Sequence, residues 1–340
     1  MTKPMSQASG RAVLVTGGAG YIGAHIAKLL SERGFRPIVF DNLSTGHLAA
    51  VQWGEFRHGD VRDTRAVRET LDESGAKTVI HLAGLIEVGR SVISPDLFWD
   101  HNVGGTASLL RAIRDSGVRR LVFSSSAAVY GAPSDACATS LSEDDAKNPA
   151  SPYGDTKLAC ERMIAAHSAA FGYSAIALRY FNAAGADPGG LIGEAHAPET
   201  HLIPLAIEAA LGRGRLSVFG DDFPTADGAC VRDYIHVNDV AAAHLAAVTT
   251  DRRDGDFEAL NVGTGRGSSV IEVIRAVETA MGRSAPFSIA PRREGDPPRL
   301  VADPARAGAA LGWAAAASTL ENIISTAVRW HSEPRYGPAL

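Results

Sequence analysis

Cysteine is scarce in this chain of 340 residues, which contains only Cys137, Cys160 and Cys230, all far apart. An odd number of widely spaced cysteines excludes a disulfide-rich scaffold and a CxxC motif, and it is typical of a reducing compartment. The chain has no run of roughly 18 apolar residues, so no transmembrane helix is expected. Its first ten residues have no apolar stretch like that of a signal peptide. We therefore expect a cytoplasmic protein.

An excess of basic residues is also missing. The chain has 33 Lys and Arg against 38 Asp and Glu, which gives a net charge of −5. A protein of this charge is not expected to bind nucleic acid or an anionic membrane, so any positive charge that holds an anionic ligand must be local. The hydrophobic fraction of 45% is ordinary for a globular protein, and the length allows one large or two medium domains.

Short apolar strands and amphipathic helices alternate through the first 180 residues or so. Residues 12–16, 37–40, 78–82, 121–124 and 175–178 have the composition of buried parallel strands, and residues 22–33 have helical spacing that ends at Gly34. This alternation predicts an α/β fold with a Rossmann-type, doubly wound parallel sheet. After Asn182 the segments are shorter and richer in Gly and Pro, which indicates a smaller C-terminal α/β domain that completes a site.

A glycine-rich loop follows the first strand. Gly17, Gly20 and Gly23 occur in TGGAGYIG, where glycine permits a tight turn and close approach of a pyrophosphate to a helix N-terminus. Asp41 ends the next strand, at the spacing of a carboxylate that binds the adenosine ribose and disfavours a 2′-phosphate. Asp60, in HGDV, is a candidate for the adenine amino group. The alternatives are a plain turn at the glycines and at Asp41, and a helix N-cap at Asp60. Together the pattern predicts an NAD site.

Two further motifs carry catalytic side chains. Tyr153 and Lys157 lie four residues apart in SPYGDTK, so on a helix they share a face, and a lysine ammonium beside a phenol favours the phenolate. Such a tyrosinate accepts a proton from an alcohol while hydride leaves its carbon. Ser124, Ser125 and Ser126 follow a strand whose end faces the ligand crevice. The alternatives are a Tyr–Lys pair on a surface helix and serines that cap a helix.

The order of the motifs resembles that of the UDP-glucose 4-epimerase family, among the extended short-chain dehydrogenases. The resemblance runs from about residue 11 to about residue 330 and rests on TGGAGYIG, DNLSTGH, HLAGLIEVGRS, FSSSAAVYG, SPYGDTK, LRYFNAAGA, CVRDYIHVNDV, NVGTG and PRREGDPP. It implies NAD that is held tightly and not consumed. It also implies interconversion of UDP-glucose and UDP-galactose, by oxidation to a 4-keto sugar and return of the hydride to the opposite face.

The resemblance also assigns site residues. Tyr153, Lys157 and Ser126 match the catalytic residues of the family. The expected cofactor contacts are Gly17, Gly20, Tyr21, Ile22, Gly23, Asp41, Asn42, Asp60, Val61, Leu82, Ala83, Gly84, Asn102, Ser124, Lys157 and Tyr180. The expected substrate contacts are Ser126, Tyr153, Asn182, His201, Leu202, Arg232, Arg293, Asp296 and Leu300. No metal is expected.

The same resemblance implies domain boundaries and an oligomer. Residues 1–182 with about 233–265 are expected to form the NAD-binding domain, and residues 183–232 with 266–340 the UDP-sugar-binding domain. A homodimer is expected through the Tyr153 helix and a helix that begins near Asn102. Three positions depart from the family: Ile86 replaces a pyrophosphate-binding lysine, for which Arg90 is a substitute, His201 replaces an asparagine, and Leu300 replaces a tyrosine that narrows the sugar pocket.

Several other functions stay open. The smaller side chain of Leu300 leaves room for N-acetylated sugars, so UDP-N-acetylglucosamine is an alternative substrate, as are UDP-xylose and UDP-arabinose. A 4,6-dehydratase requires an extra acid after the strand-end serines, where this chain has Ala127 and Ala128. A dehydrogenase that releases NADH is a further alternative. A regulator that senses NAD without catalysis would be expected to lose Tyr153 or Lys157, and both are present.

Overall fold

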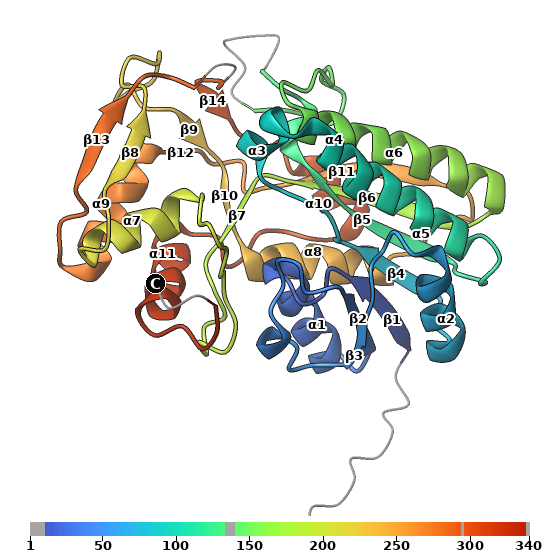
Figure 1. Cartoon of the computed structure of the whole chain (residues 1–340). Helices are drawn as coiled ribbons and strands as arrows, with labels where there is room; N and C mark the ends of the chain where they lie inside the picture. Colours follow the sequence, from blue (N-terminus) through green and yellow to red (C-terminus); the bar gives the residue numbers. More distant parts are fainter. Residues whose placement is uncertain (1–10, 133–139, 294–295, 338–340) are drawn as a thin grey trace, which may run out of the picture.

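The computed structural model describes residues 11–132, 140–293 and 296–337, so Cys137 lies outside the described residues. A seven-stranded sheet dominates the N-terminal half, in the order β11-β6-β5-β4-β1-β2-β3 (Figure 1). All neighbouring strands in it run parallel. The strand order reverses between β1 and β4, which is the switch point of a doubly wound sheet. The predicted fold class is confirmed.

The first half of the chain alternates strands and helices as the sequence predicts. The strands are β1 (Ala12–Thr16), β2 (Arg36–Asp41), β3 (Glu55–His58), β4 (Thr78–His81), β5 (Arg120–Ser126) and β6 (Ser174–Tyr180). The helices are α1 (Tyr21–Glu32), α2 (Thr64–Ser74), α3 (Val88–Ile93), α4 (Pro95–Phe98), α5 (Gly105–Ile113) and α6 (Pro152–Phe171), with the short turns η1 (Leu48–Ala50), η2 (Trp99–Gly104) and η3 (Ala127–Val129).

The second half is built from shorter pieces. The strands are β7 (Asn182–Ala184), β8 (Leu216–Phe219), β9 (Val231–Arg232), β10 (Tyr234–His236), β11 (Phe257–Val262), β12 (Ser268–Ser269), β13 (Phe287–Ala290) and β14 (Arg299–Leu300). The helices are α7 (Leu202–Ala210), α8 (Val237–Thr249), α9 (Val270–Met281), α10 (Ala305–Leu311) and α11 (Leu320–Ser332).

Apolar side chains on both faces of the large sheet bury two separate cores. Leu14 and Phe40 pack on one face with apolar residues of α2, α5 and α6, whereas Val13 and Val15 pack on the other with those of α1 and α8. Because successive side chains of a strand point to opposite faces, a strand covered on both sides must be apolar throughout. This explains why β1 reads AVLVT, with no polar residue before its last position.

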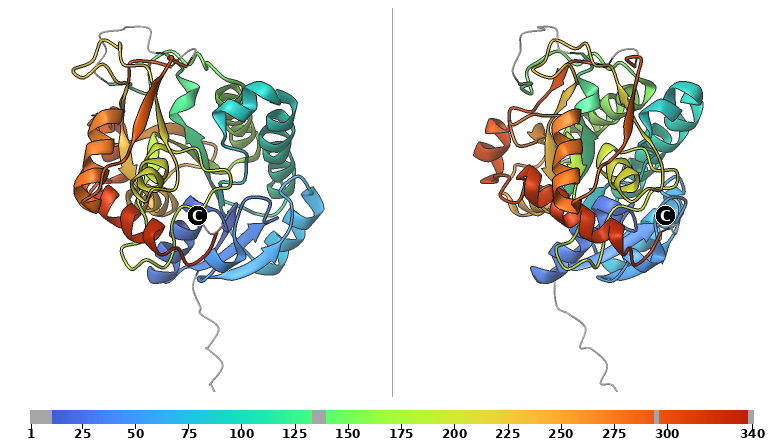
Figure 2. Two further views of the ribbon diagram at one scale, coloured as in Figure 1. Left: turned by 60° about the vertical axis from the view of Figure 1, so that its left-hand side comes forward. Right: turned by 90° about the vertical axis from the view of Figure 1, so that its left-hand side faces the viewer.

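The second half of the chain has its own hydrophobic core, and two of its segments return to the large sheet of the first half. Apolar residues of α7, α9 and α11 pack together away from the large sheet, and Figure 2 shows these helices on the side opposite α5 and α6. The chain returns to the large sheet through α8, which packs against α1, and through β11, which pairs with β6. The cleft between the two halves is therefore formed by segments that are far apart in the sequence.

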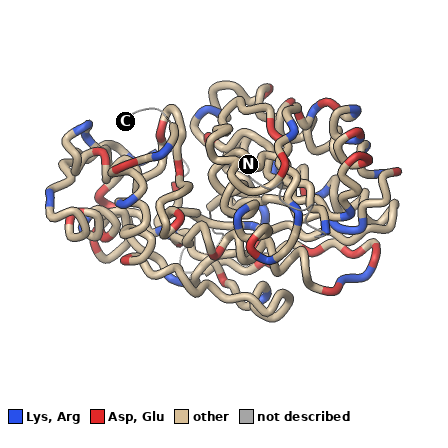
Figure 3. Tube along the Cα trace, turned by 90° about the horizontal axis from the view of Figure 1, so that it is seen from below, with Lys and Arg blue, Asp and Glu red and all other residues tan. Residues whose placement is uncertain are grey.

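Charge is spread evenly over the molecule. Lys, Arg, Asp and Glu residues alternate along both halves, and neither half gathers charge of one sign (Figure 3). Among the described residues, no helix is long and apolar enough to cross a membrane.

Candidate active site

A cavity of about 650 Å³ lies at the carboxyl ends of the strands of the large sheet. In doubly wound sheets, ligands bind at this edge, where the strand order reverses. The cavity walls come from the loop after β1, the ends of β2, β4 and β5, the start of α6, and residues 194–204 of the second half. Most of the predicted site residues line it: Gly17, Gly20, Tyr21, Ile22, Gly23, Asp41, Asn42, Asp60, Val61, Leu82, Ala83, Gly84, Ser124, Ser126, Tyr153, Tyr180, Asn182, His201 and Leu202.

The glycine loop has the shape that a pyrophosphate requires. A Cβ at Gly17 would lie 2.6 Å from the Ala83 nitrogen, and one at Gly23 would lie 2.3 Å from the Gly17 carbonyl oxygen, so neither position admits a side chain. Helix α1 begins directly after the loop, and no side chain caps its N-terminus. Uncapped N–H groups at a helix N-terminus bind phosphate. The residues present therefore fit a dinucleotide.

Two carboxylates lie at the end of the cavity beyond β2. Asp41 accepts hydrogen bonds from the backbone nitrogens of Ala19 (3.0 Å) and Leu43 (2.8 Å), and burial raises its pKa. Asp60 accepts from Arg62, and this hydrogen bond holds the pKa of Asp60 well below its usual value. A carboxylate that accepts from backbone N–H groups keeps lone pairs free for ribose hydroxyls. Asp41 thus lies where the sequence predicts a ribose-binding acid.

The three serines of β5 have different surroundings. The strand extends to Ser126, two residues further than predicted, so the serines alternate between its faces. Ser125 points away from the cavity and donates to Glu161, which is paired with the buried guanidinium of Arg179. Ser124 and Ser126 line the cavity. Only these two are available to a ligand, and the Ser124 hydroxyl is bonded to that of Tyr180.

Tyr153 lies in the first turn of α6. Ser151 caps this helix by accepting from the Gly154 nitrogen, and a Cβ at Gly154 would lie 2.5 Å from the Ala128 carbonyl oxygen. The helix is thus held against the segment that follows β5, and Tyr153 and Ser126 both line the cavity there. Lys157, one turn later, donates to the Ser124 carbonyl oxygen (2.8 Å), and its Nζ lies 5.8 Å from the centre of the Tyr153 ring.

Burial shifts the pKa values of Tyr153 and Lys157 in the directions that favour their neutral forms. It raises the pKa of Tyr153 to about 12, although the hydrogen bond with Ser126 lowers it in part. Burial also lowers the pKa of Lys157 to about 8. Burial is therefore the largest influence on the pKa of Tyr153, and the tyrosine is a phenol at neutral pH.

Two predicted cofactor residues support the cavity from behind. Lys157 is one of them, and Asn102 is the other. Asn102 is buried; it accepts from the Leu85 nitrogen (2.7 Å) and donates to the Leu85 carbonyl oxygen (3.1 Å), which fixes the loop after β4. Ile86, on this loop, lines the cavity, whereas Arg90 pairs with Glu87 and does not line it.

Four predicted substrate residues form a separate group outside the cavity lining. Arg232 on β9 pairs with Asp296, and in the strand register it lies beside Leu300 of β14. The Arg293 guanidinium stacks 3.9 Å from the centre of the Phe219 ring. Arginine side chains, one of them stacked on an aromatic ring, are suited to a nucleotide diphosphate and its base.

The segment from Glu194 to His201 forms part of the cavity wall. Of its charged residues, the sequence patterns predicted only His201 as a site residue. Glu194 and His196 line the cavity beside His201, and Glu199 lies behind them. Burial alone would raise the pKa of Glu194, but the nearby His201, its hydrogen bond to this carboxylate, and the nearby His196 hold the pKa well below its usual value. The same carboxylate raises the pKa of His201 well above its usual value, against the effect of burial. The sequence signal for this group is the spacing ExHxxExH at residues 194–201.

Known proteins are similar to this chain over nearly its full length. The model of the NAD dependent epimerase/dehydratase family matches residues 13–263. A UDP-glucose 4-epimerase from Halalkalibacterium halodurans is 46% identical over 327 residues, which is 96% of this chain and 97% of that protein. The crystal structure of UDP-glucose 4-epimerase from Brucella ovis in complex with NAD is 49% identical, with a TM-score of 0.89 over 94% of this chain and 97% of that one. A Stenotrophomonas maltophila UDP-glucose-4-epimerase with bound NAD and formylated UDP-arabinopyranose is 39% identical, with a TM-score of 0.90 over 95% and 98%.

Proposed function

Since the chain belongs to the NAD dependent epimerase/dehydratase family, we propose that it is an NAD-dependent UDP-glucose 4-epimerase that interconverts UDP-glucose and UDP-galactose. One observation carries this proposal: Tyr153 and Ser126 line the same cavity as the glycine loop and the wall from the second half. A sugar bound in this cavity is expected to place its 4-hydroxyl beside the Tyr153 phenol and its carbon 4 toward the glycine loop. The names of the similar proteins support the same reaction.

The chain's own residues perform the proton chemistry. Tyr153 accepts the proton of the sugar 4-hydroxyl, and the Ser126 hydroxyl hydrogen bonds the same oxygen and holds it in place. The glycine loop and Asp41 would hold NAD, which would supply an acceptor and donor of hydride for carbon 4 and a positive charge. Lys157 keeps its ammonium fixed on the Ser124 carbonyl oxygen and stabilises the tyrosinate. After the 4-keto sugar turns over, Tyr153 returns the proton while hydride arrives at the opposite face.

The surroundings of Tyr153 do not favour a dehydratase. That reaction requires an acid to protonate the departing 6-hydroxyl. In the structure, Ala127 and Ala128 begin η3 directly after Ser126, and neither carries an acid. The chemistry is therefore limited to removing and restoring hydrogen at one carbon.

Turnover of UDP-galactose without added cofactor tests the proposal. Purified protein is incubated with UDP-galactose, and the products are separated by chromatography while absorbance at about 340 nm reports reduced nicotinamide. We expect UDP-glucose to form without accumulation of NADH. Stoichiometric NADH would indicate a net dehydrogenase, and a 4-keto-6-deoxy product would indicate a dehydratase; either result contradicts the proposal.

We further propose that the protein is a homodimer through the outer faces of η2, α5 and α6. Large apolar side chains are exposed beside this surface: Val92 is 64% exposed, Ile93 is 83% exposed, and Trp99 is 43% exposed. Clustered apolar residues of this kind mark interaction surfaces. Light scattering should give twice the chain mass, and Ala166→Arg on the exposed face of α6 should lower it. A monomeric wild-type protein at micromolar concentration contradicts this.

The cytoplasm is the compartment we propose. Cys160 and Cys230 are buried free thiols, as is common in reducing compartments. Fractionation of cells that express the natural gene tests this, and recovery of the protein outside the cytoplasm would contradict it.

A further inference from the structure

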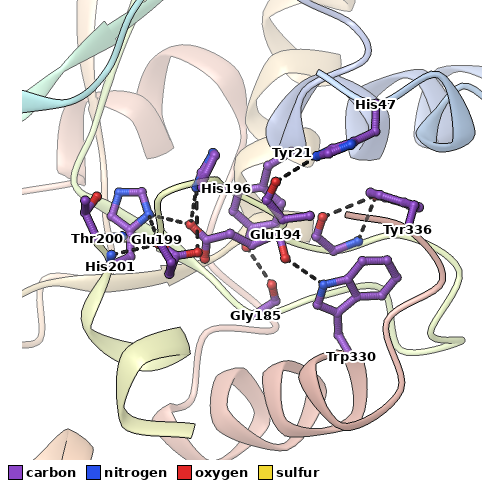
Figure 4. Close-up of polar contacts among 12 residues, drawn as sticks. Tyr21, His47, Gly185, Glu194, His196, Glu199, Thr200, His201, Trp330 and Tyr336 are labelled. Carbon is purple, nitrogen blue, oxygen red and sulfur yellow. Dashed lines mark hydrogen bonds and ion pairs between the residues drawn. The ribbon is translucent and has the colours of Figure 1, made fainter. Parts of the chain in front are cut away.

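Four side chains with metal-binding atoms meet in the loop between β7 and α7. Figure 4 shows the side chains of Glu194, His196, Glu199 and His201 turned toward one another. One ligand atom from each, two imidazole nitrogens and two carboxylate oxygens, lies within 4.8 Å of all the others. The four come from one stretch of eight residues, so they come together without contributions from distant segments.

The distances between these atoms are close to those of a four-coordinate site. His196 Nδ1 lies 3.0 Å from Glu194 Oε1, His201 Nδ1 lies 3.4 Å from Glu199 Oε1, and His196 Nδ1 lies 3.9 Å from Glu199 Oε2. A tetrahedral zinc site with bonds of 2.0–2.2 Å separates its ligand atoms by about 3.4 Å. The described cluster therefore requires only small shifts to surround a cation.

Hydrogen bonding within the cluster is incomplete. His196 Nδ1 is buried and has no hydrogen-bond partner among the described residues, although a Glu194 oxygen lies 3.0 Å away. Behind it, His331 lines a small cavity together with Glu194, His196 and Glu199; its side chain is 3% exposed, and its Nδ1 is also without a partner. Buried polar atoms are rarely left unpaired, and a site for an ion is one of the usual reasons when they are.

Further hydrogen bonds hold Glu194 and Glu199 in place. Glu199 Oε1 accepts from the backbone nitrogens of Thr200 (2.7 Å) and His201 (2.8 Å). The Glu194 carbonyl oxygen accepts from the indole of Trp330 (2.7 Å), which anchors this residue to α11. Hydrogen bonds that orient ligands are characteristic of metal sites.

We propose that Glu194, His196, Glu199 and His201 form a binding site for a divalent transition-metal ion, with Zn²⁺ as the best fit. Imidazole nitrogens favour Zn²⁺ over Mg²⁺ or Ca²⁺, which require mainly oxygen ligands. The two carboxylates also balance the charge of a divalent cation. The site lies on the wall from the second half, whereas Tyr153 lies on α6 of the first half, so the ion is not assigned to the hydride chemistry.

Metal titration of the full chain without an affinity tag tests this site. The protein is dialysed against a chelator, and Zn²⁺ is then titrated by calorimetry in the absence of nucleotide sugar. We expect one equivalent to bind, and Co²⁺ to give the intense visible absorption of a four-coordinate complex. Because this readout requires no turnover, it stands or falls separately from the epimerase proposal.

Glu199→Gln and His196→Asn are the test variants. Gln at position 199 keeps an oxygen that accepts the two backbone hydrogen bonds and removes only the charge. Each variant should weaken Zn²⁺ binding by roughly 10–100-fold or more, while far-UV circular dichroism stays unchanged.

His167→Asn is the matched control, because His167 is a partly buried histidine near the end of α6, bonded to Tyr173. It should bind Zn²⁺ like the wild type. Absence of stoichiometric Zn²⁺ binding by the wild type overturns the proposal, as does equal binding by the wild type and both test variants. A Co²⁺ spectrum typical of six-coordinate water and oxygen ligands also overturns it.

Discussion

The Tyr153–Lys157 pair and the Glu194–His201 pair lie at different walls of one cavity, and burial affects their charges in opposite ways. Neither a hydrogen bond nor an ion pair joins the side chains of Tyr153 and Lys157 in the structure. Burial moves the pKa of each side chain in the direction that favours its neutral form. Glu194 and His201 are directly bonded, and their mutual attraction outweighs burial, so both pKa values move toward the charged forms.

The wall that carries Tyr153 and the wall that carries Glu194 and His201 are therefore suited to different roles. A group kept neutral by burial responds strongly to a charge that arrives with a ligand, which suits proton transfer at Tyr153. A charged pair that is already balanced fixes the loop that carries it in the absence of a ligand.

Loss of the Tyr153 hydroxyl should have the largest effect. Tyr153→Phe should lower kcat by roughly 10²–10⁴-fold, the usual scale for a positioned general base. The ring remains, so the amount of NAD that co-purifies should not change. Steady-state epimerase assays and quantitation of released NAD measure both. Activity near that of the wild type would show that another group is the base.

Removal of the charge of Glu194 should mainly lower stability. Breaking a fully buried pair costs about 3–5 kcal/mol, but His201 is half exposed and Glu199 remains beside it, so about 2–3 kcal/mol is expected for Glu194→Gln. Urea unfolding with a chelator present measures the change.

Glu69→Gln is the control for this variant, because Glu69 pairs with Arg65 at the exposed surface of α2. Exposed pairs contribute little to stability, so no measurable change is expected there. Equal changes in the free energy of unfolding for the two substitutions would show that the Glu194–His201 pair stabilises the fold no more than an exposed pair does.

The role of Lys157 should appear in the pH dependence of turnover. The base form of Tyr153 increases as the pH rises, so kcat should increase with pH until the tyrosine is deprotonated. An ammonium lowers the pKa of the tyrosine, and its removal in Lys157→Met should move the rising limb to higher pH by about 1–3 units. A profile of kcat against pH measures this. If the two profiles differ only in height, Lys157 acts in binding alone.

The smallest effect is expected at Leu300, away from both pairs. Leu300 packs against an apolar cluster that includes Phe181, and Phe181 lines the cavity, so a larger residue at position 300 is expected to narrow the space for the sugar. We expect wild-type turnover of UDP-N-acetylglucosamine, and Leu300→Tyr should lower its kcat/KM by about 10-fold or more while UDP-galactose turnover stays similar. Absence of wild-type activity on the acetylated sugar would contradict the prediction.

Much of the fold was predictable because its signals are local. The composition of β1, the glycines at 17, 20 and 23, and Asp41 at the end of β2 follow from short-range patterns. The ends of elements were less accurate: β5 reaches Ser126 because pairing with β6 continues there, and that pairing joins residues more than 50 positions apart.

Local patterns in the sequence were enough to predict the parallel sheet and the glycine loop after β1, because periodicity and glycine conformation act over a few residues. Which serines face the cavity depends on the folded chain, since Ser125 is turned toward Glu161 and the neighbouring Arg179. The same holds for the burial that raises the pKa of Tyr153 and for the pairing of Glu194 with His201. Burial and pairing depend on segments that the chain brings together only when it folds, and spacing along the sequence does not record them.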